Sequence, residues 1–257
     1  MGKKTNNNQN KNIVDLSMDM QVGEVPFASY PRPNLVRGTK WINLNGKWDC
    51  GVTVPFPLQS RLSGFKGPVP DEYTYYTSFD YFSEWDHRVL LHFGAVDQTC
   101  TVFVDGHKVG SHEGGYLPFT FDITDELDNS EIHKLEVRIR DTLDTKYPYG
   151  KQTKNRGGMW YTPVSGIWQT VWIEEVPLDY IKSLKITPSL TGIDLEINCH
   201  ETEYSIEITE PKNDGTGNFG KSKAIKQLTI QGNKAHIEVE DPKNWTPDDP
   251  WLYGIRI

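Results

Sequence analysis

Apolar and polar residues alternate along much of the chain after Trp41, and a period of two predicts β-strands. The alternation is strictest at residues 134–141, where three apolar side chains face one way and charged side chains face the other. It also predicts a strand at residues 88–93. Residues 167–174 carry bulky side chains on both faces, which predicts a strand that is covered on both sides. Because no segment has the period of an amphipathic helix, the pattern predicts an all-β fold.

Turn signals separate the predicted strands. Asp105-Gly106 stands between two apolar segments, and this pair readily adopts the positive φ angles of a type I′ hairpin turn. A glycine-rich corner follows at Gly114-Gly115, and Pro118 fixes φ where the next strand begins. These residues are predicted to shape a fold rather than to carry out a reaction.

The pattern divides the chain into three parts. Residues 1–27 include an Asn- and Lys-rich stretch with little to bury, and they are predicted to be disordered or irregular. Residues 28–177 are predicted to form one large β-domain. Residues 178–257 are predicted to form an immunoglobulin-like sandwich, with short strands near 180–186, 193–199, 204–209, 223–230, 234–239 and 251–257.

The second predicted domain is smaller than a complete sandwich of its kind. Its six strands fall short of the roughly seven strands and about 100 residues of an immunoglobulin-like domain. The sequence ends within the predicted strand 251–257, which would leave an apolar edge without a partner. We therefore expect the C-terminal strand of this domain to be missing and the chain to be truncated.

Composition and charge argue against several classes of function. The net charge of −8 over 257 residues disfavours nucleic acid as a partner. The three cysteines form no Cys-x-x-Cys pair, so neither a zinc site nor a disulfide framework is indicated. The polar N-terminus does not look like a secretory signal, and no apolar run reaches membrane-spanning length. We expect a cytoplasmic protein without a membrane partner.

A long connection at residues 146–164 is the strongest candidate for function, because loops of this length often carry it. The rings of Trp160 and Tyr161 could stack on a sugar, and packing at a domain interface is the alternative. The candidate site residues of this loop are Lys151, Gln152, Arg156, Trp160 and Tyr161. Outside the loop, His112-Glu113 lacks the second histidine of a helical zinc motif, so no metal and no cofactor is predicted.

Several phrases of the sequence, taken in order, carry a family resemblance. They are residues 41–48, 54–60, 92–97, 104–110, 114–124 and 166–172. These phrases resemble the non-catalytic N-terminal domain of family 2 glycoside hydrolases, which include β-galactosidases, β-glucuronidases and β-mannosidases. A further phrase, at residues 244–253, looks like a late strand of that family's second domain.

The resemblance implies an architecture and an activity. It implies a jelly-roll, galactose-binding-like β-sandwich, then an immunoglobulin-like sandwich, then a (β/α)8 barrel that carries two catalytic glutamates. The parent protein would be a retaining glycosidase acting on β-galactosides or β-glucuronides. This sequence has no Asn-Glu dipeptide and no alternation of strands with helices, so we assign no catalytic residue and expect the chain alone to be inactive.

The resemblance also suggests which loops approach the sugar site of the barrel. Asp71, Glu72 and Asp97 are candidates for its rim, and the alternative is a solvated or purely structural turn. In some β-galactosidases the long loop supplies an Asp to a sodium ion. Gly157 and Gly158 stand there in this chain, so a sodium site is not predicted. The expected partners are a carbohydrate substrate through the parent enzyme, the missing barrel and a second copy of the chain.

Two other classes of function stay open. A free-standing carbohydrate-binding module would bind sugar through exposed rings such as Trp160 and Tyr161. A purely structural domain would dock a barrel or a second subunit. The unpaired edge expected near residue 257 favours docking over the free module.

Overall fold

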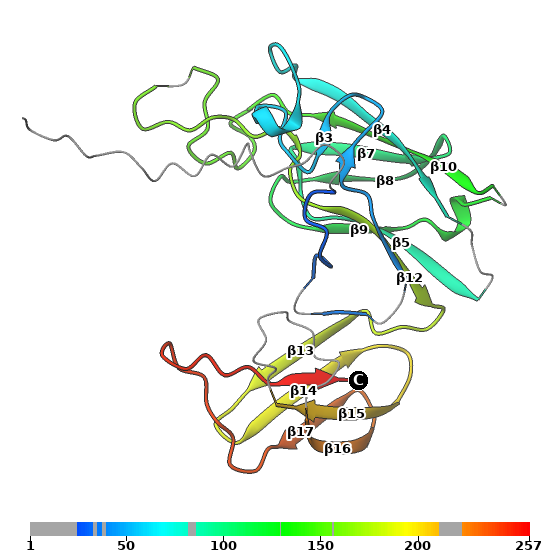
Figure 1. Ribbon diagram of the computed structural model, residues 1–257, viewed down its shortest axis with the longest axis vertical. Helices are drawn as coiled ribbons and strands as arrows, with labels where there is room; N and C mark the ends of the chain where they lie inside the picture. Colours follow the sequence, from blue (N-terminus) through cyan, green and yellow to red (C-terminus); the bar gives the residue numbers. More distant parts are fainter. Residues whose placement is uncertain are drawn as a thin grey trace, which may run out of the picture. The chain divides into compact units, whose positions relative to one another are not determined.

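The computed structural model describes most of the chain after residue 24. Its described residues form two compact units. The first contains residues 25–32 and most of the chain from 36 to 175, and the second contains residue 35 and most of the chain from 176 to 257. Figure 1 shows strands throughout both units, and the helical elements of the described residues are two short 3-10 turns. The predicted all-β fold is confirmed. The described residues are 25–32, 35–37, 40–81, 86–128, 130–155, 157–210 and 223–257.

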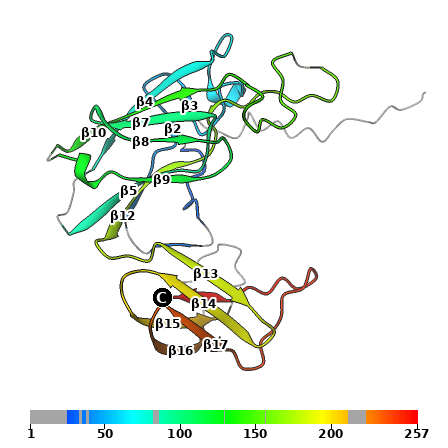
Figure 2. The same ribbon diagram turned by 180° about the vertical axis from the view of Figure 1, so that it is seen from behind.

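The first unit is built on two four-stranded sheets (Figures 1 and 2). One sheet has the order β4-β10-β7-β8, and the other has the order β1-β12-β5-β9. Strands of the first sheet are β4 (Glu72–Asp80), β10 (Ile132–Arg140), β7 (Thr99–Val104) and β8 (His107–Glu113). Strands of the second are β1 (Trp41–Asn43), β12 (Val171–Pro177), β5 (His87–Phe93) and β9 (Phe119–Asp122). This arrangement agrees with the expected jelly-roll sandwich.

Two small pairs of strands complete the first unit. Strand β2 (Gly46–Lys47) pairs with β3 (Thr53–Val54). Strand β6 (Val96–Asp97) pairs with β11 (Gly166–Ile167), with Asp97 opposite Gly166. This pairing links the residues just after β5 to the strand that follows the long loop at residues 146–164.

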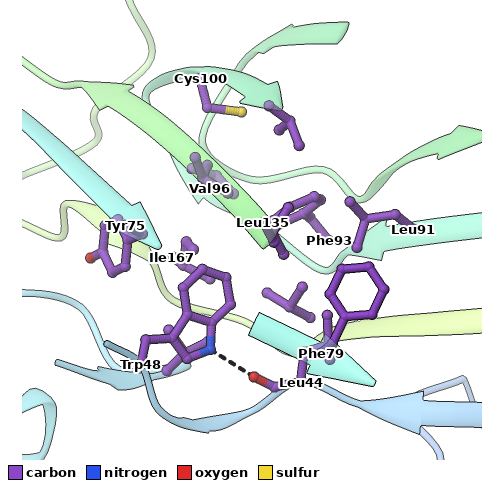
Figure 3. Packing of buried hydrophobic residues seen from close by; sticks show 14 of the residues in the cluster. Leu44, Trp48, Tyr75, Phe79, Leu91, Phe93, Val96, Cys100, Leu135 and Ile167 are labelled. Carbon is purple, nitrogen blue, oxygen red and sulfur yellow. Dashed lines mark hydrogen bonds between the residues drawn. The ribbon is translucent and has the colours of Figure 1, made fainter. Parts of the chain in front are cut away.

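Alternating apolar side chains build the core of the first unit (Figure 3). On β10, Leu135 and Val137 are fully buried while their neighbours along the strand are more exposed, as the sequence predicts. Trp48 fills the same core, and its indole Nε1 donates a hydrogen bond to the Leu44 carbonyl oxygen at 2.7 Å. A buried indole N–H needs such a partner, so this bond lets a large ring enter the core.

The predicted strand at residues 167–174 is wrong in its continuity. It consists of β11 and β12, separated by residues 168–170, because the chain crosses close to Gly94 there. A Cβ on Gly94 would stand 2.7 Å from the Cβ of Gln169, and the Gly94 amide donates to the Thr170 carbonyl. Its burial on both faces is confirmed for β12 up to Val176. Strand β5 is likewise buried on both faces, a feature the alternation at residues 88–93 did not predict.

The predicted hairpin turn is confirmed. Asp105 and Gly106 have φ angles of 49° and 83°, as a type I′ turn requires. The Asp105 carboxylate fixes the neighbouring strand as well, because Oδ1 accepts the amide of Lys134 at 2.7 Å.

The second unit has strands where the sequence predicts them. It contains the sheets β13-β14-β17 and β16-β15-β18, packed around Leu195, Ile206 and Ile237. The predicted loop around residues 211–220 lies outside the described residues. The strands are β13 (Ser183–Pro188), β14 (Gly192–Asn198), β15 (Glu203–Thr209), β16 (Ala224–Gln231), β17 (Lys234–Glu238) and β18 (Gly254–Arg256).

A buried ionic cluster fastens the N-terminal lead-in to β12. The fully buried Glu174 carboxylate accepts hydrogen bonds from the Tyr30 hydroxyl, Arg32 Nη2 at 2.5 Å and Arg37 Nη1 at 2.7 Å, and His92 Nε2 lies 3.1 Å from it. Burial alone would raise the pKa of Glu174. The hydrogen bonds from His92 and Tyr30 and the charge of Arg32 outweigh it and lower this pKa to about 2.

Replacing Glu174 by Gln should destabilise the first unit by about 3 kcal/mol, because it leaves the partly buried guanidinium groups of Arg32 and Arg37 without a counter-charge. Urea unfolding at pH 7 measures this loss. The matched control is Glu136→Gln, which breaks the more exposed pair with Arg138 and should cost less than about 1 kcal/mol.

The same cluster predicts a pH dependence. Because the folded-state pKa of Glu174 is depressed, its contribution is fully present above its ordinary pKa of 4.5 and is lost as the pH falls towards 2. The Glu174→Gln variant should therefore lose less stability than the wild type between pH 5 and pH 2.5. Equal losses in both proteins would contradict this account of the cluster.

Candidate functional site

The glycine-rich corner after β8 lies directly on a buried carboxyl group. A Cβ added to Gly115 would stand 2.4 Å from Oδ1 of Asp97, so only glycine lets the backbone come this close. The amide of Gly114 donates to the Gln98 carbonyl at 2.9 Å, and the Trp168 indole donates to the Gly115 carbonyl at 2.8 Å. The corner is thus held from two sides.

Asp97 is a buried acid in this structure. The sequence suggested a turn between strands, but Asp97 lies within β6 and is only 5% exposed. No hydrogen bond to its carboxyl group is found among the described residues. Burial, reinforced by the negative charge of Asp141, raises the pKa of Asp97 to about 7. A substantial fraction of this group is therefore neutral near physiological pH.

A second polar network fixes the C-terminal end of the long loop. The Ser165 hydroxyl donates to Asp141 Oδ2 at 2.6 Å. The Gln59 side chain accepts the Ser165 amide at 2.9 Å and donates to the Ser165 hydroxyl at 2.8 Å. Sequence reasoning missed all three residues, because nothing in the sequence signals a contact between positions 59 and 165.

Gln152 ties the two sides of the loop together. Its Oε1 accepts the Val164 amide at 2.5 Å, and its Nε2 donates to the Tyr116 hydroxyl at 3.4 Å. The Tyr161 amide donates to the Lys151 carbonyl at 2.9 Å beside it, which makes a short bridge across the loop. We call residues 114–118, 146–155 and 157–164 together the rim.

An ion pair joins the rim to the segment before β4. Lys154 Nζ lies 2.6 Å from Asp71 Oδ1, and the backbone carbonyl of Asp71 accepts the Asp141 amide at 2.8 Å. Both charged side chains are about half exposed, so the pair contributes little to stability by itself. Its position brings the candidate Asp71 next to the loop.

Several large aromatic and apolar side chains of the rim are exposed. Trp160 is 50% exposed and Tyr161 is 64% exposed, and three further large side chains of the rim are exposed as well. These three are Tyr116, Leu117 and Met159. A group of exposed apolar side chains on an otherwise fixed support is typical of a surface that contacts a ligand or another domain.

The structure separates the remaining candidates. Lys151 is exposed on the loop, and Arg156 lies outside the described residues. Glu72 was predicted in a loop, but it begins strand β4 and lies 3.5 Å from the Arg140 guanidinium. It lines a shallow hollow of about 660 Å³ on the outer face of the sheet β4-β10-β7-β8. Glu72 therefore belongs to a sheet strand rather than to the loop that we expected.

Potential metal ligands gather elsewhere. Within the described ranges, the group of three whose ligand atoms lie close together is Asp105, Asp128 and His133. The Asp105 carboxylate is already occupied by the Lys134 amide and by His133 Nδ1 at 2.7 Å, which gives it a structural role. No helix in the described part of the chain is long and apolar enough to cross a bilayer.

Two family models match separate parts of this chain. A family model described as the glycosyl hydrolase 2 galactose-binding domain-like domain matches residues 69–165. A second, described as glycosyl hydrolases family 2, matches residues 180–257. Together the two models cover most of both structural units.

Similar proteins include glycosidases much longer than this chain. A β-galactosidase of Thermoanaerobacter pseudethanolicus is 28% identical over 181 residues, which cover 66% of this chain and 23% of the relative. A human β-glucuronidase is 27% identical over 170 residues, which cover 56% of this chain and 26% of the relative. The chain thus spans about a quarter of the length of these curated relatives.

Solved structures share the fold. The β-D-glucuronidase of Dictyoglomus thermophilum aligns with a TM-score of 0.65 at 21% identity, covering 88% of this chain and 42% of that one. The β-glucuronidase of Ruminococcus gnavus aligns with a TM-score of 0.65 at 19% identity, with the same coverage of both chains. At this level of identity the likeness concerns architecture.

Replacing Gln152 by Ala should loosen the rim without unfolding the domain, because it removes the hydrogen bonds to Val164 and Tyr116. We expect proteolysis within residues 146–164 to become roughly fivefold faster, as the loss of about 1 kcal/mol of local hydrogen bonding implies. Timed thermolysin digestion with mass spectrometry measures this rate. The control is Asn155→Ala in the same loop, and an equal acceleration in both variants would contradict the role given to Gln152.

Proposed function

Because the chain belongs to glycoside hydrolase family 2, we propose that it forms the non-catalytic N-terminal part of a retaining glycosidase. Retention needs two carboxylates about 5–5.5 Å apart, one as nucleophile and one as acid and base. In this proposal both stand on a (β/α)8 barrel that follows residue 257 in the parent protein. The two β-sandwiches of this chain then support the barrel rather than carry out the reaction.

The rim is the part of this chain that we propose to border the sugar site. The observation that carries the proposal is its construction: buried contacts fix its base, while Trp160, Tyr161 and Tyr116 stay exposed. A fixed support that presents exposed rings suits recognition of a pyranose, whose faces stack on aromatic side chains. Asp71 and Lys154 add a charged edge that could bind sugar hydroxyls.

We propose β-galactosides or β-glucuronides as the substrate class. The support is that relatives of both kinds match the chain, while the structural neighbours named above are β-glucuronidases. Both sugars are β-linked pyranosides, so one rim of exposed rings and polar groups is compatible with either. The two sugars differ in the substituent at C5. Contacts with that substituent would select between them, and we assign no residue of this chain to such a contact.

A docking role is the second candidate function. The exposed apolar side chains of the rim favour it, because such a patch also suits burial against another domain or a second copy of the chain. The two roles are compatible if the rings of the rim pack partly on the barrel and partly on the sugar. A free-standing sugar-binding module is the alternative that requires binding by this chain alone.

The proposal predicts different activities for two proteins. The protein encoded by the entire reading frame should hydrolyse a nitrophenyl β-D-galactoside or β-D-glucuronide. The pure 257-residue chain should release no nitrophenol above the blank, because we assign it no catalytic carboxylate pair. Turnover by the pure chain, or none of either substrate by the entire protein, would contradict the proposal.

Calorimetry separates the rim from a free module. The 257-residue chain is titrated with galactose, glucuronate and their oligosaccharides. A role completed by the barrel predicts no measurable heat with the chain alone. Saturable heat that disappears in a Trp160→Ala variant would instead identify an independent binding module.

A further inference from the structure

The carboxyl group of Asp97 contacts the glycine-rich corner, and its strand pairs with the strand that follows the long loop. Its strand partner is Gly166, just after the end of the long loop, and its oxygens pack on the backbone of Gly115 in the corner. We propose that Asp97 is a positioning residue for the rim: as a neutral acid it lets the corner close over it, and its ionisation loosens the corner and, through it, the loop. The importance for sugar binding rests on the proposed function, but the test below does not require activity.

The close packing around the Asp97 carboxyl group is the first reason for this assignment. A Cβ on Gly115 would lie 2.4 Å from Oδ1 and 2.5 Å from Cγ of Asp97, so the glycine backbone covers the carboxyl group directly. The Trp168 indole holds the Gly115 carbonyl from the other side. A charged carboxylate needs water or hydrogen-bond donors. Among the described residues no donor reaches the Asp97 carboxyl group, and the residue is only 5% exposed.

The charges around Asp97 are the second reason. Asp141 faces it from the segment after β10, and its carboxylate is held by the Ser165 hydroxyl at 2.6 Å and the Leu143 amide at 3.0 Å. From β8, His112 Nε2 lies 3.1 Å from the Gly114 carbonyl oxygen. From β4, the Tyr75 hydroxyl lies against Gly166, and burial keeps this hydroxyl neutral by raising its pKa. Among the described residues the charge that acts on Asp97 is therefore negative.

A series of contacts connects Asp97 to the loop that bears the exposed rings. The corner continues from Gly115 into Tyr116, whose hydroxyl accepts from Gln152, and Gln152 in turn accepts the Val164 amide. On the other side, Gly166 follows Ser165, which Asp141 and Gln59 hold. Trp160 and Tyr161 lie between these two anchors along the chain. Loosening the corner thus releases the loop that presents both rings.

The direction of the pH effect follows from the closed and open states. In the closed rim, burial and Asp141 raise the pKa of Asp97 to about 7, while a solvated carboxyl in the open rim has its ordinary value of 3.8. Opening therefore releases a proton between about pH 4 and pH 7. Across that window the open population rises by up to about tenfold per pH unit, and it levels off above pH 7.

Hydrogen exchange of the 257-residue chain tests the proposal directly. We follow the amides of Tyr161, Val164 and Ser165, which are hydrogen-bonded in the closed rim, from pH 5 to pH 8. After correction for the intrinsic pH dependence of exchange, the wild type should open about 50-fold more at pH 7 than at pH 5. From pH 7 to pH 8 the corrected rate should rise by no more than about twofold.

Two variants separate positioning from a general structural role. Asp97→Asn keeps the shape of the side chain without the titration, so its corrected profile should be flat. The matched control Asp71→Asn removes an exposed carboxylate that pairs with Lys154 at the same rim. It should speed exchange uniformly and keep the wild-type dependence on pH. A flat wild-type profile, or a wild-type slope in Asp97→Asn, would overturn the proposal.

A titration of carboxyl groups covers the case in which Asp97→Asn does not fold. Carbon-13 NMR of aspartate carboxyls in the wild type should show one resonance with a midpoint near pH 7. Asp141→Asn should move this midpoint to lower pH by removing the neighbouring negative charge. Absence of any aspartate that titrates above pH 6 would refute the proposal. Failure of the proposed function would instead appear as a lack of hydrolysis by the entire protein.

Discussion

Close approach of the backbone at two glycines determines the geometry of the candidate site. A Cβ on Gly115 would stand 2.4 Å from the Asp97 carboxyl oxygen, and one on Gly166 would stand 2.1 Å from the Tyr75 hydroxyl. These glycines belong to the corner and to the strand that follows the long loop. Because Gly115 has no side chain, the corner closes over a buried carboxyl group, and because Gly166 has none, the strand after the long loop packs against Tyr75.

Two buried carboxyl groups of the first unit have pKa values shifted in opposite directions. The Glu174 carboxylate has several donors, so its pKa is depressed and its charge fastens the lead-in to β12. The Asp97 carboxyl has no such donors among the described residues, and burial raises its pKa. Glu174 thus anchors the lead-in to β12, whereas Asp97 makes the rim responsive to pH.

Much of the fold could be predicted from the sequence because it rests on local patterns. Strict alternation on β10 and the Asp105-Gly106 turn gave the right structure, since each depends on neighbouring residues. The break between β11 and β12 could not be predicted in this way. It arises where Gln169 crosses Gly94, and nothing in the sequence links two residues so far apart.

In the candidate site, too, local features could be predicted from the sequence and tertiary contacts could not. The length of the loop at residues 146–164 marked it as a candidate, and its exposed rings could be read from residue type. Gln59, Asp141 and Ser165 were missed because their roles exist only after distant segments meet. Asp97 was recognised as a candidate, but its burial and its contact with Gly115 depend on tertiary packing.

The central claim is that the rim of this chain borders the sugar site of a glycosidase. The most direct test is kcat/KM of the entire encoded protein for a nitrophenyl β-glycoside after Tyr161→Ala, compared with Trp245→Ala, which removes an exposed ring of the second unit. The account predicts a decrease of about tenfold or more for Tyr161→Ala, as the loss of one stacking contact implies, and little change for Trp245→Ala. An unchanged kcat/KM in the Tyr161 variant would contradict it.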